Sequence, residues 1–226
     1  MKHGKKYTES AKKYTAEKVY DLTEALTLVK SMAFAKFDES IDLSVKLNLK
    51  KSQSVRDTVV LPHQFRGETK VLVFCKPEKE KEAQEAGAAF VGADDLIEKV
   101  KGGWTDFDVA VATPDMMKDV GKLGMVLGRK GLMPNPKTGT VSFDIKGTLA
   151  ELKKGRVEFR ADKTGVMHLA VGKVSMEAEK VAENVRVVMT EVKRKRPVDA
   201  KGEFILTVSL ASTMGPGVWV DFKDKE

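Results

Sequence analysis

Hydrophobic and polar residues alternate along two stretches near the ends of the chain. Every second residue from 41 to 49 is apolar, and residues 204–210 repeat nearly the same pattern. A period of two is typical of a strand with one buried and one solvent-exposed face. Two further strands are predicted at 157–160 and 166–171, because residues 162–165 between them have the composition of a tight turn.

A helical period appears in the same two regions. Apolar residues recur at helical spacing from 22 to 33 and again from 178 to 192. Asp21 or Thr23 would cap the first helix, and the second would begin near Ser175. Antiparallel strands half covered by two helices form a two-layer α+β domain.

The middle of the chain follows a different pattern. Residues 71–74 and 109–112 are continuous apolar runs, as expected of strands that are buried on both faces. Between them we predict a charged helix at 78–86, a short strand at 89–91 and a second helix at 94–101. The alternation of strand and helix implies right-handed crossovers and a small parallel sheet in a three-layer domain.

The charge divides the chain in the same places. The 226 residues carry a net charge of +7. Residues 1–67 hold 13 basic and 8 acidic side chains, residues 68–159 hold 15 of each, and residues 160–226 hold 12 and 10. All of the excess positive charge therefore lies in the two ends, which favours an anionic partner there. We predict an α/β protein in which residues 1–67 and 160–226 form one basic domain and residues 68–159 form a neutral inserted domain.

Composition and motifs argue against several classes of protein. No stretch approaches the roughly 18 apolar residues of a membrane span, and the basic N-terminal region has no apolar block of the signal-peptide kind. The single cysteine, Cys75, reads as a small buried hydrophobe and fits a reducing, cytoplasmic setting. The glycines at 121–131 do not match a phosphate loop or a dinucleotide fingerprint, and His3, His63 and His168 show no metal-binding spacing. No enzymatic activity, cofactor or metal is expected.

Four segments have the chemistry to contact RNA, and each has a plain structural alternative. The Gly-Arg-Lys-Gly segment at 128–131 suits either an RNA backbone clamp or a helix C-cap, and the basic run at 193–196 suits either a phosphate-binding patch or a helix end. The structural alternative is favoured for both. The Lys-Phe pair at 36–37 suits phosphate binding with stacking, or a core position for Phe37, and residues 212–217 suit close approach to an RNA backbone or a plain turn. For these two the residue pattern leaves both readings open.

Several segments together resemble one known family. In chain order they are 35–39 (AKFDE), 59–63 (VVLPH), 86–88 (AGA), 106–115 (DFDVAVATPD), 131–137 (GLMPNPK), 157–160 (VEFR) and 212–216 (STMGP). The set closely resembles the bacterial form of the ribosomal L-one stalk protein family, nearly end to end and in collinear order. The resemblance implies a discontinuous two-layer α+β RNA-binding domain that carries an inserted three-layer α/β/α Rossmann-like domain.

The resemblance also implies a function. It implies a structural constituent of the large ribosomal subunit that binds the ribosomal RNA of the mobile stalk near the tRNA exit site, assists release of deacylated tRNA and represses translation of its own mRNA. The expected partners are therefore the stalk ribosomal RNA, the mRNA of its own operon and the exit-site tRNA, with no membrane. The expected form off the ribosome is a cytoplasmic monomer.

The family's RNA contacts carry over onto matching positions of this chain. They are Lys36, Phe37, Ser40, Lys46, Arg160, Asp162, Lys163, His168, Thr207, Ser212, Thr213, Met214 and Gly215. The cations suit phosphates, the hydroxyls and the Gly215 backbone suit sugar and phosphate, and Phe37 and Met214 suit bases or riboses. Two rival functions stay open on the residues alone: an α/β enzyme whose insert binds a nucleotide, and a general basic nucleic-acid binder.

Overall fold

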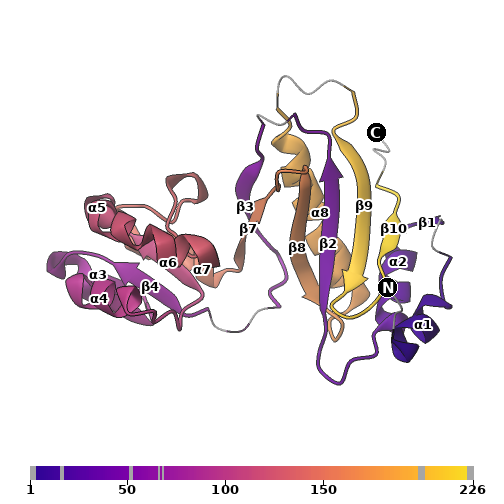
Figure 1. Cartoon of the computed structure of the whole chain (residues 1–226), viewed down its shortest axis with the longest axis horizontal. Helices are drawn as coiled ribbons and strands as arrows, with labels where there is room; N and C mark the ends of the chain where they lie inside the picture. Colours follow the sequence, from indigo (N-terminus) through magenta and orange to yellow (C-terminus); the bar gives the residue numbers. More distant parts are fainter. Residues whose placement is uncertain are drawn as a thin grey trace. The chain divides into compact units, whose positions relative to one another are not determined.

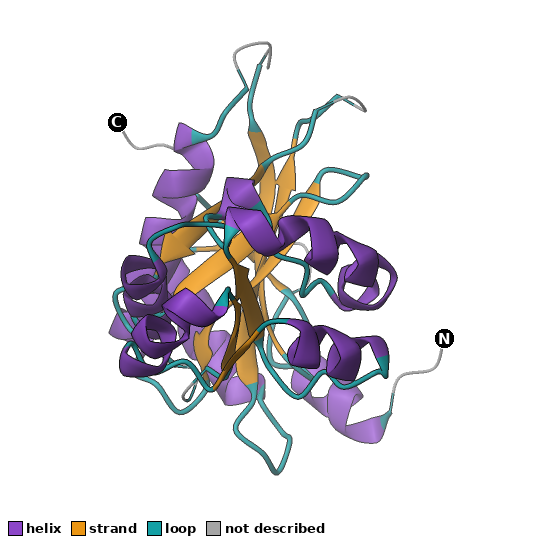
Figure 2. Ribbon diagram, turned by 90° about the vertical axis from the view of Figure 1, so that its left-hand side faces the viewer, coloured by secondary structure: helices purple, strands orange, loops and turns teal. Residues whose placement is uncertain are grey.

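The protein is a mixed α/β chain of two compact units. The computed structural model describes residues 4–15, 18–50, 53–65, 67, 69–197 and 202–222 (Figure 1). One unit, here the basic unit, comprises Met1–Phe65 and Val157–Glu226, and the other, the inserted unit, comprises Arg66–Arg156. Both units contain strands and helices. Figure 2 colours the helices purple and the strands orange.

The basic unit is built on a five-stranded sheet of order β1-β10-β9-β2-β8. Strand β2 is antiparallel to both β8 and β9, β10 is antiparallel to β9, and β1 runs parallel to β10. Burial alternates residue by residue along β2, which confirms the predicted period of two. The strands are β1 (Val19–Tyr20), β2 (Ser40–Leu47), β8 (Val166–Lys173), β9 (Ile205–Ser212) and β10 (Val218–Val220).

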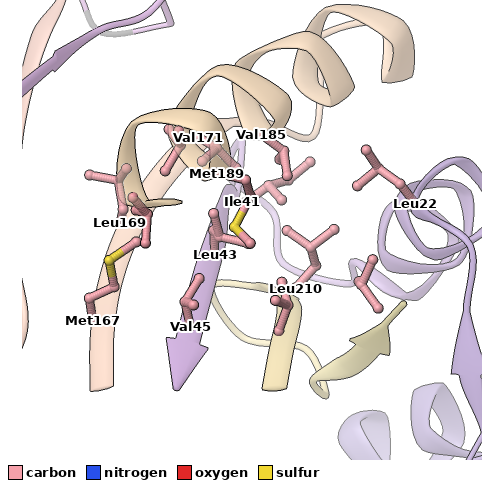
Figure 3. Close-up of a cluster of buried hydrophobic side chains, with 14 of the residues drawn as sticks. Leu22, Ile41, Leu43, Val45, Met167, Leu169, Val171, Val185, Met189 and Leu210 are labelled. Atoms are coloured by element: carbon pink, nitrogen blue, oxygen red, sulfur yellow. The ribbon is translucent and has the colours of Figure 1, made fainter. Parts of the chain in front are cut away.

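Two helices, α2 (Leu22–Met32) and α8 (Ala178–Arg194), cover one face of this sheet. Figure 3 shows side chains of α8 and α2 above the apolar residues of β8, β2 and β9. Asp21 caps α2, as predicted, by accepting a hydrogen bond from the Thr23 N–H at 3.3 Å. The second helix begins three residues later than expected, because Ser175 is held in the preceding turn by Asp38. A short helix α1 (Lys5–Ala11) had no clear signal in the sequence.

A separate two-stranded sheet joins β3 (Arg56–Val60) to β7 (Arg156–Arg160). Val157 and Phe159 of β7 are buried in the core of the basic unit. The division between the units therefore falls after residues 65 and 156, whereas the sequence pattern placed it after 67 and 159.

The inserted unit contains a parallel sheet of order β5-β4-β6 with helices on both faces. One face packs against α3 and α7, and the other packs against α4, α5 and α6. All four residues of β4 are buried, as the continuous apolar run predicted. The strands are β4 (Val71–Phe74), β5 (Phe90–Gly92) and β6 (Val109–Ala112), and the helices are α3 (Pro77–Glu85), α4 (Asp94–Lys101), α5 (Met117–Val120), α6 (Gly124–Lys130) and α7 (Ile145–Lys153), with single 3-10 turns η1 (Pro114–Met116), η2 (Gly121–Leu123) and η3 (Pro136–Thr138).

This fold places three features that the sequence singled out. Gly131 ends α6 as a left-handed C-cap with φ of 71°, so the Gly-Arg-Lys-Gly segment is a helix end. The basic run at 193–196 closes α8, with Lys195 as its C-cap. Cys75 is buried, and burial raises the pKa of its thiol, as expected of a small packed hydrophobe.

Every helix in the described part of the chain is too short or too polar to cross a bilayer. The described residues likewise contain no group of three His, Cys, Asp or Glu side chains that could hold a metal ion, and His3 lies outside them.

Candidate nucleic-acid interface

The face of the basic-unit sheet opposite α2 and α8 carries polar side chains along β2, β8 and β9. Ser44 of β2 lies between His168 of β8 and Ser209 of β9, and its Oγ is 2.9 Å from His168 Nδ1. One row further along, Lys46 lies beside Thr207. In the other direction Asp42 lies between two alanines, Ala170 and Ala211. Such small side chains allow a nucleic-acid backbone to approach the sheet closely.

The first candidate loop follows α2. Lys36 and Phe37 lie between α2 and β2, and both are exposed. The side chain of Phe37 is 57% exposed, so the structure does not support a core position for it. An exposed aromatic ring beside a cation can stack on a base while the cation meets a phosphate.

The second candidate loop is the turn after β9, which extends the β2–β9 ladder by one step. The Thr213 N–H donates to the Ser40 carbonyl at 3.0 Å, and the Ser40 N–H donates to Thr213 Oγ1 at 2.9 Å. Met214 is exposed, and the Gly215 N–H donates to the Ser212 carbonyl at 3.1 Å. Ser40, Thr213 and Met214 therefore lie together at one end of the polar face.

A buried carboxylate, Glu39, joins the two loops. It is 1% exposed and accepts hydrogen bonds from the N–H groups of Phe34 at 3.0 Å, Ala35 at 2.7 Å and Met214 at 3.1 Å. Burial alone would raise its pKa, but these N–H groups and the nearby Ser212 hydroxyl together hold the pKa below its ordinary value of 4.5. Glu39 is therefore ionised at neutral pH and fixes one loop against the other.

Ser212 is placed differently from the other candidates. Its side chain is buried, on the same side of β9 as Val208 and Leu210, because residues two apart on a strand share a face. Its hydroxyl lies under Gly215, where an added Cβ would be 2.4 Å from Ser212 Oγ. In this structure the Ser212 side chain lies beneath the turn and supports it, whereas the family resemblance predicted that it contacts RNA.

The hairpin between β7 and β8 carries the candidates of the opposite end. The Asp162 carboxylate accepts hydrogen bonds from Thr164 Oγ1, Val166 N–H and Thr164 N–H, and these bonds lower its pKa. Gly165 has a φ of 78°, which confirms the predicted tight turn. The Lys46 ammonium donates a hydrogen bond to the Thr164 carbonyl. The side chains of Arg160 and Lys163 are exposed. Asp162 thus shapes the hairpin that presents the cations.

One outward residue of β9 was not foreseen. The alternation of residues 204–210 predicted that Leu206 is buried, but it is exposed. The pairing of β2 with β9 shifts between Lys46 and Leu47, so that Thr207 faces Lys46 while Ile205 faces Leu47. Leu206 is the extra residue of this irregularity, and a bulge of this kind turns a side chain out of its expected face.

All thirteen candidate residues lie in the basic unit, and twelve of them keep part of their surface exposed. Ser44, Ser209 and Asp42 belong to the same polar face but were not among the candidates. The alternation along β2 and β9 was the signal that could have found them. Cations, hydroxyls and two exposed apolar side chains on one surface can bind an RNA backbone and contact its bases.

Comparison with known proteins identifies the family of this chain. Residues 29–216 match the model of the ribosomal protein L1p/L10e family. The chain is 64% identical to the large ribosomal subunit protein uL1 of Treponema denticola over 99% of both chains. It is 57% identical to uL1 of Borrelia hermsii over 98% of this chain and 99% of the relative, and 54% identical to uL1 of Leptospira biflexa over 99% and 97%. The chain therefore belongs to the ribosomal protein L1 family, a structural and non-enzymatic component of the large ribosomal subunit.

Proposed function

We propose that the polar face of the basic unit binds the ribosomal RNA of the mobile stalk of the large subunit, near the tRNA exit site. The observation that carries the proposal is the pair of loops held together by Glu39, which present Lys36, Phe37, Thr213 and Met214 at one end of an open sheet face. Family membership supports the ribosomal setting.

Each side chain has a role in this proposal. Lys36, Lys46, Arg160 and Lys163 neutralise phosphates, and Phe37 and Met214 contact bases or riboses. Ser40, Thr207 and His168 offer polar atoms to sugar and phosphate, Asp162 shapes the hairpin, and the exposed backbone at Thr213 and Gly215 allows close approach. Ser212 acts from beneath the turn.

Two further roles depend on the same binding of RNA. We propose that an element of the protein's own mRNA folds like the stalk RNA, so that binding represses its translation, and that the stalk complex assists release of deacylated tRNA from the exit site. Off the ribosome the protein would be a cytoplasmic monomer.

A filter-binding competition tests the proposed recognition. The competitors are a stalk ribosomal RNA fragment from Treponema denticola, the leader of this protein's own mRNA and a random RNA duplex. Stalk RNA and leader should compete for one site with similar strength, and the duplex should bind at least about a thousandfold more weakly at the same salt concentration. Equal binding of all three RNAs would instead identify a general basic binder.

We further propose that the basic unit is an independent two-layer RNA-binding domain and the inserted unit a three-layer Rossmann-like domain. Each has its own apolar core. Residues 1–65 joined by a short linker to 157–226 should therefore fold and keep most of the affinity for stalk RNA, whereas isolated residues 66–156 should fold and bind poorly. Circular dichroism and filter binding measure both, and tight, specific binding by the inserted unit would contradict the assignment.

The variant Lys46→Ala should weaken binding of every RNA by a similar factor, about threefold, because it removes a phosphate contact. The slope of the logarithm of affinity against the logarithm of salt concentration should fall by about one. Lys154→Ala, which removes an exposed cation from the inserted unit, is the matched control and should leave the slope unchanged. An unchanged slope in Lys46→Ala would mean that this ammonium contacts no phosphate.

A further inference from the structure

A groove with a volume of about 1130 Å³ lies at the β9–β10 side of the basic-unit sheet. Three large apolar side chains that line it, Val19, Leu206 and Trp219, are exposed. Trp219 is 42% exposed because β10 turns Val218 and Val220 into the core and the residue between them outward. A Trp ring open to solvent in this way is free to receive a planar partner.

Trp219 belongs to the same face as the candidate RNA contacts. It lies opposite Ser209, which lies opposite Ser44, which lies opposite His168, so that one row of side chains runs from the groove across the sheet. Directly opposed residues of antiparallel strands point to the same face. Thr207, one of the proposed contacts, also lines the groove. The groove is thus continuous with the proposed interface.

We propose that Trp219 is a stacking site for an unpaired nucleotide of the bound RNA, with Leu206 and Val19 forming the apolar walls beside it. This inference rests on the proposed function and extends the interface from β9 to β10 and β1. Unpaired bases stack on exposed aromatic rings with little sequence preference, because every base has a π face.

The charges around the groove fit a nucleotide better than a free anion. Lys193 and Arg196 line the groove together with Glu203 and Asp221, so that both signs are present. The Lys193 ammonium lies 5.5 Å from the centre of the Phe222 ring, and Arg196 donates to the Gly202 carbonyl at 2.9 Å. The edge of a base has hydrogen-bond donors, which a carboxylate can bind, and acceptors, which a cation can bind. The phosphate of the same nucleotide can lie toward Lys193 and Arg196. Continuity with the polar face favours RNA over a protein segment.

The test uses the full chain and the Treponema denticola stalk RNA fragment. The chain has two tryptophans, so in Trp104→Phe the fluorescence comes from Trp219 alone. We expect stalk RNA to quench this fluorescence with the same midpoint as filter binding. Trp219→Ala should weaken binding about tenfold, and Trp219→Phe should recover most of the loss. The salt dependence should be unchanged in both, because no charge is removed.

Phe143→Ala is the control, since it removes an exposed aromatic ring from the inserted unit and should bind RNA like the wild type. If wild type and Trp219→Ala bind stalk RNA equally tightly, the stacking site is overturned while the proposed function stands. If the wild type does not prefer stalk RNA to duplex, the proposed function itself fails. Quenching by a ribosomal protein fraction without RNA, and none by stalk RNA, would overturn the stacking site in favour of a protein-docking surface.

Discussion

Replacing Glu39 by Gln should lower the affinity for stalk RNA about thirtyfold, equivalent to about 2 kcal/mol. The carboxylate receives N–H groups on both oxygens, from Phe34 and Ala35 on one and from Met214 on the other. An amide keeps one acceptor oxygen and places an NH₂ group where the second acceptor stood, so one loop loses its partner and a buried N–H is left unpaired. The two loops then no longer present Phe37 and Met214 together.

The sign of this effect separates positioning from electrostatics. Glu39→Gln removes a negative charge near a surface that binds phosphates, so Coulomb attraction alone would strengthen RNA binding. Asp38→Asn is the matched control, because it removes the neighbouring carboxylate. That carboxylate is exposed, and it interacts with Ser175 and Lys173 and does not join the two loops. We expect Asp38→Asn to bind as well as the wild type or slightly better. Tighter binding by both variants would show that Glu39 does not position the loops.

The pH dependence of stability gives a second measurement of the same contact. The folded-state pKa of Glu39 lies below the ordinary value of 4.5, so its contribution to stability is fully present above that value and is lost as pH falls through the lower folded-state pKa. The difference in unfolding free energy between the wild type and Glu39→Gln should therefore be constant from pH 7 to about 5 and shrink below 4.5. Urea unfolding at a series of pH values measures it.

Periodicity was sufficient to predict the regular parts of the fold. The helix at 94–101 and the strands at 71–74 and 109–112 have the bounds that the sequence pattern indicated. In these elements the burial of the apolar positions agrees with the local sequence pattern, so that pattern determines the result. Periodicity did not predict the candidate contacts, whose positions came from the family resemblance. It could not decide, for example, whether Phe37 is a core residue or a surface residue.

The features that were missed depend on contacts between distant segments. Asn184 is fully buried in α8, where its amide donates to the carbonyls of His63 at 2.9 Å and Val171 at 2.8 Å. Its apolar neighbours give no sign of these partners. The outward turn of Leu206 likewise depends on the register between β2 and β9. The burial of Glu39, in contrast, could have been predicted, because the period of two that buries Ile41 and Leu43 also points residue 39 inward.

Gly215→Ala should lower the affinity for stalk RNA at least about tenfold and destabilise the protein by about 1 to 3 kcal/mol. The φ of Gly215 is not positive, so an alanine suffers no backbone strain here. The obstacle is space, because the new Cβ would lie 2.4 Å from the oxygen of Ser212, a short and buried side chain. Relief of the clash requires a shift of the Ser212 hydroxyl, which lies near the Glu39 carboxylate, or of the turn that carries Thr213 and Met214. Gly217→Ala is the control, since nothing lies within 4 Å of its added Cβ.

The double variant Ser212→Ala, Gly215→Ala identifies the cause. Without the hydroxyl, the nearest atom to the new Cβ is the Cβ of residue 212 at 3.7 Å, an ordinary contact. The double variant should therefore bind RNA more tightly than Gly215→Ala alone and recover part of its stability, with a coupling energy of about 1 to 2 kcal/mol in the double-mutant cycle. Thermal unfolding and filter binding of the wild type, both single variants and the double variant complete the cycle. Strictly additive effects would mean that RNA requires a bare glycine at position 215 for its own close approach, independent of Ser212.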